Sequence, residues 1–319
     1  MKVSVLIHPE ELTKKWIDRM VANGIDTLGL HPPGGPDAHV TLEKLIALLE
    51  TEEFRELIDY ARSKGLGIEY EFHAAGYLVH RKLFAEHPEY FRMNEQGERV
   101  NDLNFCVSDN DALEVAAKEA AKLANRLYGC DERYFFWLDD AAGGKCHCPK
   151  CKDLTPSDQQ LVALNAMIAE IRREKPNAQL AYLAYFDTLD LPQTVAPVDG
   201  IFLEYAPIDK WRRRPGEREK YAEKVKRELA SREPLINYFG KKNSRVLEYW
   251  IDNSLFSGWK KPPQRLECDG SEADADIKEY LKLGYEDIST FGCFLGEDYE
   301  ELYGEPDIKP FTDAVRKNR

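Results

Sequence analysis

One pattern constrains the fold of this chain more than any other: short apolar segments alternate with amphipathic helical segments along its 319 residues. The apolar segments are nearly continuous in aliphatic or aromatic residues, which is typical of strands buried on both faces. Glycines stand directly between a helical segment and the next strand, as at Gly65 and Gly284, where the left-handed conformation ends a helix. The predicted strands are Lys2–Leu6, Thr27–Leu30, Gly67–Phe72, Tyr134–Leu138, Gln179–Ala184, Gly200–Leu203, Leu235–Phe239 and Ile288–Phe291.

Eight such strands in a chain of this length predict an α/β protein with a closed (β/α)8 barrel, the TIM barrel. An open, doubly wound sheet is the alternative. No Gly-x-Gly-x-x-Gly sequence or P-loop follows the first strand, which removes the usual nucleotide sites of open sheets. No linker or low-complexity tract divides the chain, so we expect a single catalytic-type domain over residues 1–319.

Two further local features can be predicted. The helix that contains Leu161 and Leu164 is expected to begin at Ser157 as N-cap, with Asp158 in its first turn. The connection after the third strand, residues 74–108, is long and rich in aromatic residues. Connections of this length in a compact domain are usually functional or disordered, and we expect an ordered loop that covers the barrel mouth.

Charge and cysteine content restrict the partners and the compartment. The formal net charge is −13, which disfavours a nucleic acid partner because phosphate binding needs clustered Lys and Arg. No apolar stretch is long enough to cross a membrane, and the start, MKVSVLIHPEEL, lacks the apolar region of a signal peptide. Seven cysteines cannot all pair within the chain. We therefore expect a cytoplasmic protein with free or metal-bound thiols.

Polar residues follow the predicted strands, at the end of a barrel where active sites lie. Three of the seven histidines follow the first three strands in succession, which favours a site over an ordinary polar rim. In strand order the residues are His8, His31, His73, Asp139 with Asp140, Tyr185 with Asp187, Glu204 with Tyr205, and Asn237 with Tyr238.

Carboxylates and aromatic rings together suit a small carbohydrate, whose hydroxyl groups need polar partners and whose C–H faces stack on rings. The expected catalytic pair is Asp140 and Glu204, in the acid and base or nucleophile roles of glycoside cleavage. Neighbouring strand residues point to opposite faces, so Asp139 is expected to support Asp140. The predicted sugar-binding residues are His8, His31, His73, Tyr185, Tyr205, Tyr238 and Trp137.

A metal-dependent hydrolase or sugar isomerase is the rival chemistry, because His, Asp and Glu at strand ends also bind divalent metals. The chain contains no His-x-His or His-Glu-x-x-His spacing, which lowers this alternative.

Cys146, Cys148 and Cys151 form a C-x-C-x-x-C sequence, which can wrap a tetrahedral zinc ion. The fourth ligand of a structural site is expected to be Cys106, with His147 as a local alternative. A disulfide within the loop or plain reduced thiols are the other interpretations. The remaining cysteines, Cys130, Cys268 and Cys293, are expected to be ordinary buried thiols.

Several stretches together resemble a known family: FAEHPEYFRMNEQGERV, NFCVS, FWLDD with CHCPKC, PSDQ, AYLAY, FLEYAP and EYWIDNSLFSGWKKP. They resemble a bacterial domain-of-unknown-function family numbered 4838, whose members are glycoside-hydrolase-like barrels. Some relatives are similar to endo-acting β-N-acetylglucosaminidases, and the HPE loop looks like those of α-glucuronidases and hexosaminidases. In hexosaminidases an Asp-Glu pair after the fourth strand carries the chemistry. Asp139 matches that Asp, and Asp140 stands where the general-acid Glu would be.

The resemblance and the residues together predict a glycoside hydrolase that acts on sugars containing N-acetylhexosamine or uronic acid. Asp is one methylene shorter than Glu, so Glu204 could take the acid role from Asp140. No cofactor is expected in the reaction, and zinc is expected only as a structural ion. The alternatives are a carbohydrate-binding barrel without catalysis and a metal-dependent sugar isomerase or lyase.

Overall fold

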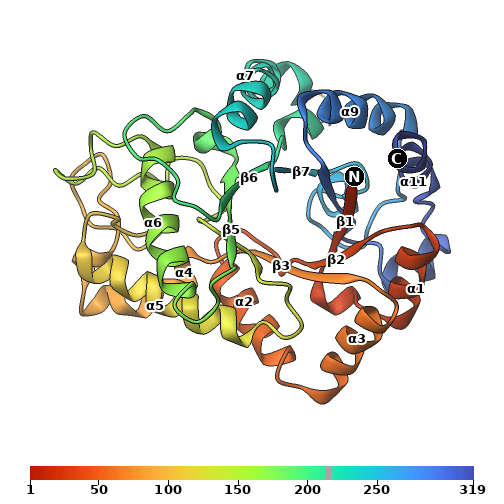
Figure 1. Cartoon of the computed structure of the whole chain (residues 1–319), viewed down its shortest axis with the longest axis horizontal. Coiled ribbons are helices and arrows are strands. Elements are labelled where there is room, and N and C mark those ends of the chain that lie inside the picture. The colour runs from red at the N-terminus through yellow and green to blue at the C-terminus, as the bar shows by residue number, and fades with distance from the viewer. Residues whose placement is uncertain (213–216) are drawn as a thin grey trace. The chain divides into compact units, whose positions relative to one another are not determined.

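The computed structural model describes residues 1–212 and 217–319 (Figure 1). Eight parallel strands follow one another around a closed barrel, with helices between them, which confirms the predicted TIM barrel. In the described residues no helix is long and apolar enough to cross a membrane. The strands are β1 (Lys2–Ile7), β2 (Thr27–Leu30), β3 (Gly67–His73), β4 (Arg133–Trp137), β5 (Gln179–Ala184), β6 (Ile201–Tyr205), β7 (Arg245–Glu248) and β8 (Asp287–Phe291).

Helices occupy most of the connections between strands. Residues 185–200, between β5 and β6, carry only a short 3-10 turn. Gly65 and Gly284 have φ of 89° and 103°, which confirms the predicted left-handed helix ends. The helices are α1 (Lys14–Ala22), α2 (Ala38–Leu48), α3 (Glu52–Ser63), α4 (Ala75–Leu78), α5 (Asn110–Arg126), α6 (Pro156–Ile171), α7 (Glu217–Phe239), α8 (Asn253–Phe256), α9 (Gly270–Leu283), α10 (Glu297–Tyr303) and α11 (Lys309–Asn318).

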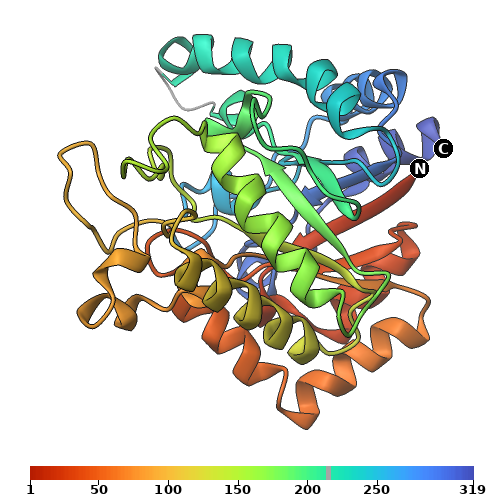
Figure 2. The same cartoon turned by 60° about the vertical axis from the view of Figure 1, so that its left-hand side comes forward.

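The chain forms two compact units. The first unit comprises residues 1–31, 56–69 and 203–319, and the second comprises residues 32–55 and 70–202. In the first unit β1 pairs with β2 and β8, β7 pairs with β8, and α9 packs on α11. In the second unit β4 pairs with β5, and α5 and α6 lie side by side (Figures 1 and 2).

The predicted strand over Leu235–Phe239 is wrong, because these residues form the last turn and a half of α7. The seventh strand is Arg245–Glu248. Its two terminal residues are charged, so the segment does not show the apolar run used to find the other strands. As a result, Asn237 and Tyr238 lie on a helix and do not follow a strand.

The charged residues of β7 are buried in ion pairs. Arg245 Nη1 lies 2.6 Å from Glu69 Oε2 on β3, and Arg245 Nε lies 3.0 Å from Glu204 Oε1 on β6. All three side chains are at most 1% exposed. Because β3 and β7 are not neighbours in the barrel order, the contact between Arg245 and Glu69 crosses the barrel interior. The interior therefore holds two carboxylates on one guanidinium.

The connection between β3 and α5 is ordered, as predicted for this long loop. It contains α4, two 3-10 turns at Arg81–Ala85 and Pro88–Tyr90, and an isolated antiparallel bridge between Met93 and Arg99. That this loop covers the barrel mouth stays a prediction.

The N-terminus of α6 begins two residues earlier than predicted. Thr155, not Ser157, is the N-cap, and its hydroxyl accepts from the Asp158 amide at 3.0 Å. Pro156 at the first helical position favours this start because its fixed φ is already helical. Asp158 Oδ2 accepts in return from the Thr155 amide and hydroxyl at 3.1 and 2.7 Å.

Asp158 also fixes the segment after β5. Its Oδ1 accepts from the backbone amides of Gln193, Thr194 and Val195 at 2.8–2.9 Å. Burial opposes ionisation of this carboxyl, but the hydrogen bonds from Thr194, Thr155 and Val195 outweigh it and lower the pKa of Asp158 to about 2.

We expect Arg245→Met to destabilise the protein strongly, because it leaves Glu69 and Glu204 buried without their common partner. Breaking a buried pair in this way costs about 3–5 kcal/mol in the free energy of unfolding. Chemical denaturation measures the change. Arg245→Lys keeps the positive charge but loses the guanidinium group that pairs with both carboxylates, so its free energy of unfolding should lie between those of Arg245→Met and wild type. If the free energy of unfolding of Arg245→Met lies within about 1 kcal/mol of the wild-type value, the stabilising role of these buried ion pairs is contradicted.

We expect Asp158→Asn to lose a pH-dependent part of the stability. The folded pKa of about 2 lies below the ordinary value of 3.8, so ionised Asp158 stabilises the fold above pH about 4. The contribution is about 2 kcal/mol near neutral pH and disappears as the pH falls through 2. Urea unfolding of both proteins should show a difference that shrinks between pH 5 and pH 2. A difference constant with pH would contradict this assignment.

Candidate functional site

Three of the predicted site residues meet in the second unit, at the carboxyl ends of β3, β4 and β5. The Tyr185 hydroxyl donates to Asp140 Oδ1 at 3.1 Å, and His73 Nε2 lies 3.9 Å from the same oxygen. His73 Nδ1 donates to the Leu138 carbonyl at 2.5 Å. Because a carbonyl oxygen only accepts, Nδ1 carries the hydrogen and Nε2 faces the carboxylate. Asp140 keeps 30% of its side chain exposed, so it can contact a ligand.

A glycine after β2 fits closely against this group. A Cβ placed on Gly34 would lie 2.9 Å from Asp140 Oδ2 and 3.1 Å from His73 Cδ2. Asp140 is therefore held between Tyr185 and His73 at one oxygen and the Gly34 backbone at the other. Gly34 was not anticipated from the sequence, although the PPGGP stretch around it is a signal for close backbone approach.

Asp139 has a different role from its neighbour. Its carboxylate forms an ion pair with Arg81 and accepts from the Asn104 amide. The Asp139 amide donates to Asn104 Oδ1 at 2.8 Å, and Arg81 Nη1 donates to the Asn104 carbonyl at 3.0 Å. Asp139 thus joins the end of β4 to the loop after β3. This arrangement favours the supporting role expected for it.

Asn104 and Arg81 were not anticipated from the sequence. Asn104 has φ of 46°, a left-handed conformation that Asn tolerates better than most residues. The side-chain Nδ2 of Asn104 also donates to the Gly144 carbonyl at 3.1 Å. One side chain therefore contacts the backbone both at Asp139 and after Asp140.

A small cavity of about 50 Å³ lies beside His73, Asp139 and Tyr185. That volume accommodates a few water molecules. Trp137, predicted to bind sugar, is 3% exposed and packs edge-on against the His73 ring at a centroid distance of 5.1 Å. Its observed contact is with His73, whose ring it helps to orient.

In the first unit, His8 and His31 lie together at the ends of β1 and β2. His8 Nδ1 is 2.8 Å from the His31 carbonyl, and the His31 ring packs edge-on against Phe291. Burial lowers the pKa of His8. Glu11, which was not predicted, accepts from the amides of His8 and Leu295 at 3.0 Å, and burial raises its pKa to about 8. The structure thus places His8 and His31 near the buried carboxyl group of Glu11. That these histidines form one site with Asp140 at the barrel mouth stays a prediction.

The other predicted residues of the first unit have structural contacts. Glu204 is fully buried in its ion pair with Arg245. Tyr205 is also fully buried, and its hydroxyl donates to the Glu228 carbonyl at 2.8 Å. Tyr238 lies in the last turn of α7 and is 38% exposed. Their contact with a sugar stays a prediction.

An aromatic pocket of about 280 Å³ follows β6 and β7 in the first unit. Trp259 is 54% exposed there, with Trp211 and Phe256 beside it. The Trp211 indole donates to buried Glu248 at 2.6 Å, which fixes its ring. Arg212 and Arg265 also line this pocket. Rings and charged groups in one hollow suit a sugar, and the sequence signal was the WKKP stretch with its isolated Trp259.

The four predicted metal-ligating cysteines come together in the second unit. Cys106, Cys146, Cys148 and Cys151 are all buried, with their sulfur atoms within 4.8 Å of one another. Hydrogen bonds from the thiols of Cys146 and Cys151 lower the pKa of Cys106, so its thiolate form is favoured. The alternative ligand His147 is 29% exposed and lies 4.0 Å from Glu95. Cys106 is therefore confirmed as the fourth member of the cluster.

Family comparison gives a match over more than half of the chain. The family model described as "Domain of unknown function (DUF4838)" matches residues 50–239, a range that contains Asp139, Asp140 and the four cysteines. A search of curated proteins finds no match.

Among solved structures, 207 chains match. The β-galactosidase of the psychrophilic Marinomonas ef1 is 14% identical with a TM-score of 0.53, and the match covers 91% of this chain and 54% of that one. A broad-specificity GH5-4 endoglucanase from Bacteroides salanitronis is 12% identical with a TM-score of 0.52, covering 96% and 85%. A GH20 module of the pneumococcal exo-β-D-N-acetylglucosaminidase StrH is 14% identical with a TM-score of 0.53, covering 99% and 84%.

At these identities the solved structures show the fold alone. The chain spans about half the length of the β-galactosidase. All three are glycoside hydrolases by name, and they share the barrel with this protein.

We expect Arg81→Met to loosen the loop after β3. The Arg81 and Asp139 side chains are only 13% and 10% exposed, and a hydrogen bond between charged groups contributes about 1.5–3 kcal/mol. Amide exchange near Asn104 should therefore accelerate tenfold or more, as measured by mass spectrometry. Lys82→Met, at the exposed next residue, is the matched control and should leave exchange unchanged. We call the contacts of Asp139 with Arg81 and Asn104 the Asp139 clamp. Equal amide exchange in both variants would contradict a loop held by this clamp.

Proposed function

The chain belongs to the DUF4838 family, and we propose that it is a glycoside hydrolase in which Asp140 is the catalytic acid and base. The observation that carries this proposal is the position of Asp140. It follows a barrel strand at the carboxyl end, keeps a partly exposed carboxyl group, and is oriented by Tyr185, His73 and Gly34.

The neighbours of Asp140 suit proton transfer. The Tyr185 hydroxyl stabilises the carboxylate that remains after Asp140 gives its proton to a leaving-group oxygen. His73 is held in one tautomer by the contact of its Nδ1 with the Leu138 carbonyl, and its Nε2 faces Asp140 Oδ1 at 3.9 Å. These contacts hold the carboxyl group of Asp140 in position for proton transfer.

The second carboxylate of the expected pair is less suited to the reaction. Glu204 is fully buried on Arg245, so using it as a nucleophile would break the barrel's interior ion pair. Substrate-assisted cleavage needs only one protein carboxyl group, because the sugar supplies its own nucleophile. We therefore favour a substrate with a 2-acetamido group.

In that reaction Asp140 protonates the glycosidic oxygen while the acetamide carbonyl oxygen attacks C1 and the C1–O bond breaks. Asp140, now a carboxylate, removes a proton from water, and the water oxygen opens the cyclic intermediate at C1. The second step returns the proton to Asp140 and leaves a free sugar with its acetamide intact. The GH20 module named above shares the barrel and acts, by its title, in an exo-β-D-N-acetylglucosaminidase.

The aromatic pocket of the first unit is a separate candidate site for a sugar. Arg212 and Arg265 line that pocket with Trp211, Trp259, Glu217 and Glu267, and guanidinium groups bind carboxylates well, so a uronic acid is a second candidate ligand. The ligand proposed for Asp140 is a small carbohydrate that carries N-acetylhexosamine. Location in the cytoplasm stays a prediction from the cysteine content.

The reaction proposed here uses no metal. Among the described residues, the four cysteines form the one group of His, Cys, Asp or Glu ligand atoms close enough to share an ion. Four thiolates occupy all four coordination positions of a tetrahedral ion. This suits a structural zinc and leaves no open position for substrate. This lowers the metal-dependent isomerase or lyase alternative.

We expect Asp140→Asn to lower kcat/KM on aryl 2-acetamido-glycosides at least 100-fold, since general acid–base catalysis contributes about 10²–10⁴. The measurement is release of the aryl group. Asp153→Asn, at an exposed aspartate in the following loop, is the matched control and should keep full activity. Tyr185→Phe, which removes the hydrogen-bond donor to Asp140 Oδ1, should lower kcat with little change in KM.

Three results would contradict the proposal or part of it. Full turnover by Asp140→Asn would remove Asp140 from the chemistry. Sugar binding by calorimetry without turnover by the wild type on any aryl glycoside would instead support the carbohydrate-binding alternative. Equal rates on 2-acetamido and 2-hydroxy glycosides would point back to a protein nucleophile.

A further inference from the structure

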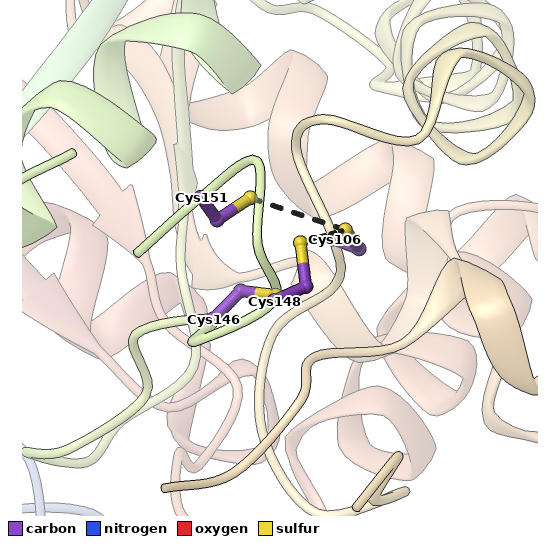
Figure 3. A group of neighbouring side chains, drawn as sticks. All are labelled: Cys106, Cys146, Cys148 and Cys151. Carbon is purple, nitrogen blue, oxygen red and sulfur yellow. Dashed lines mark hydrogen bonds between the residues drawn. The ribbon is translucent and has the colours of Figure 1, made fainter. Parts of the chain in front are cut away.

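The four buried cysteines connect two segments that are distant in sequence. Cys106 belongs to the connection between β3 and α5, and the other three belong to the connection between β4 and α6. Figure 3 shows the four side chains pointing toward one another from these two segments. Cys106 Sγ lies 3.7 Å from Cys148 Sγ and 3.9 Å from Cys151 Sγ.

These sulfur distances match a metal tetrahedron. A zinc–sulfur bond of about 2.3 Å places two sulfurs of a tetrahedral site about 3.8 Å apart. A disulfide would require about 2.05 Å, and all four cysteines are free thiols in the structure. The spacing therefore fits one ion among four sulfurs and does not fit a covalent pair.

Polar groups of the protein contact the sulfur atoms. The Met93 amide donates to Cys146 Sγ at 3.3 Å. The Cys151 thiol donates to Ser108 Oγ at 3.1 Å, and the same oxygen lies 3.4 Å from Cys148 Sγ. Four thiolates on a divalent ion carry a net charge of −2, and the Met93 amide and the Ser108 hydroxyl, which can donate to a thiolate, offset part of that charge.

A short path leads from the cluster to the candidate site. Asn104 lies two residues before Cys106, and Gly144 lies two residues before Cys146. The Asn104 side chain donates to the Gly144 carbonyl at 3.1 Å and accepts from the Asp139 amide at 2.8 Å. Asp139 is the residue next to Asp140. The cluster and the Asp139 clamp therefore hold the same two segments at neighbouring points.

We propose that the cluster binds one Zn²⁺ through four thiolates, and that this ion sets the position of Asp140 by fixing the two segments around Asn104. The ion takes no part in the chemistry, because its four positions are filled by protein. Zinc binding itself does not depend on the reaction, whereas the effect on Asp140 rests on the proposed function.

Helix α6 extends the same arrangement. Gln159 Nε2 donates to the carbonyls of Cys146 and Cys151 at 3.0 and 3.1 Å, and its Oε1 accepts from the Cys146 amide at 2.9 Å. The cysteine loop is thus anchored to α6 independently of any ion, and Cys106 is the ligand that ties it to the other segment. Replacing Cys106 should therefore remove the link between the two segments and leave the cysteine loop folded on α6.

The test compares wild type, Cys106→Ser and Cys130→Ser, the last being a matched control at a cysteine outside the cluster. Metal analysis of the full-length protein should give one zinc per chain in wild type and Cys130→Ser. Cys106→Ser should lose most of its zinc, and amide exchange near Asn104 and Gly144 should accelerate tenfold or more. Replacement of zinc by Co²⁺ should give the visible absorption of a tetrahedral thiolate site.

Wild type without zinc, iron in place of zinc, or full zinc retention by Cys106→Ser would overturn the proposed site. Zinc loss with unchanged exchange around Asn104 would overturn the coupling. None of these readouts uses activity, so they stand apart from a failure of the proposed function. If turnover is found, Cys106→Ser should lower kcat about tenfold or more while KM changes little, since a displaced catalytic group mainly affects the chemical step.

Discussion

The barrel depends on the requirement that its strands are buried on both faces, so every charged side chain inside it must meet an opposite charge. Arg245 meets that requirement for two carboxylates at once, Glu69 and Glu204, from strands on different sides of the barrel order. This interaction determines what Glu204 can do. A carboxylate that neutralises the interior is not available as a nucleophile without a large loss of stability.

The same reasoning separates the two adjacent aspartates. Asp139 has its carboxylate on Arg81 and Asn104, whereas Asp140 keeps a partly exposed carboxyl group beside Tyr185 and His73. One carboxylate therefore holds a loop and the other faces solvent. Their difference arises from the partners that each carboxyl group meets after the end of β4 and not from their chemistry, which is identical.

The sequence predicted the barrel because most of its strands are apolar, and it failed at β7, where Arg245 and Glu248 hide the pattern. From local geometry it predicted separate roles for Asp139 and Asp140, and the catalytic role of Asp140 stays a prediction. It did not predict Arg81, Asn104 or Gly34, which come from other connections and meet the site only through tertiary structure. The aromatic residue Tyr238 was misplaced together with its strand.

The cysteine cluster and the Asp139 clamp constrain the same two segments, and this ordering does not depend on whether the protein hydrolyses sugars. Their presence supports an ordered site and says nothing by itself about catalysis. Asp140 is different, because its contacts hold its carboxyl group in place without enclosing it. A structural carboxylate gains nothing from such exposure, whereas a proton donor needs it. The choice between a hydrolase and a carbohydrate-binding barrel therefore depends on this one side chain.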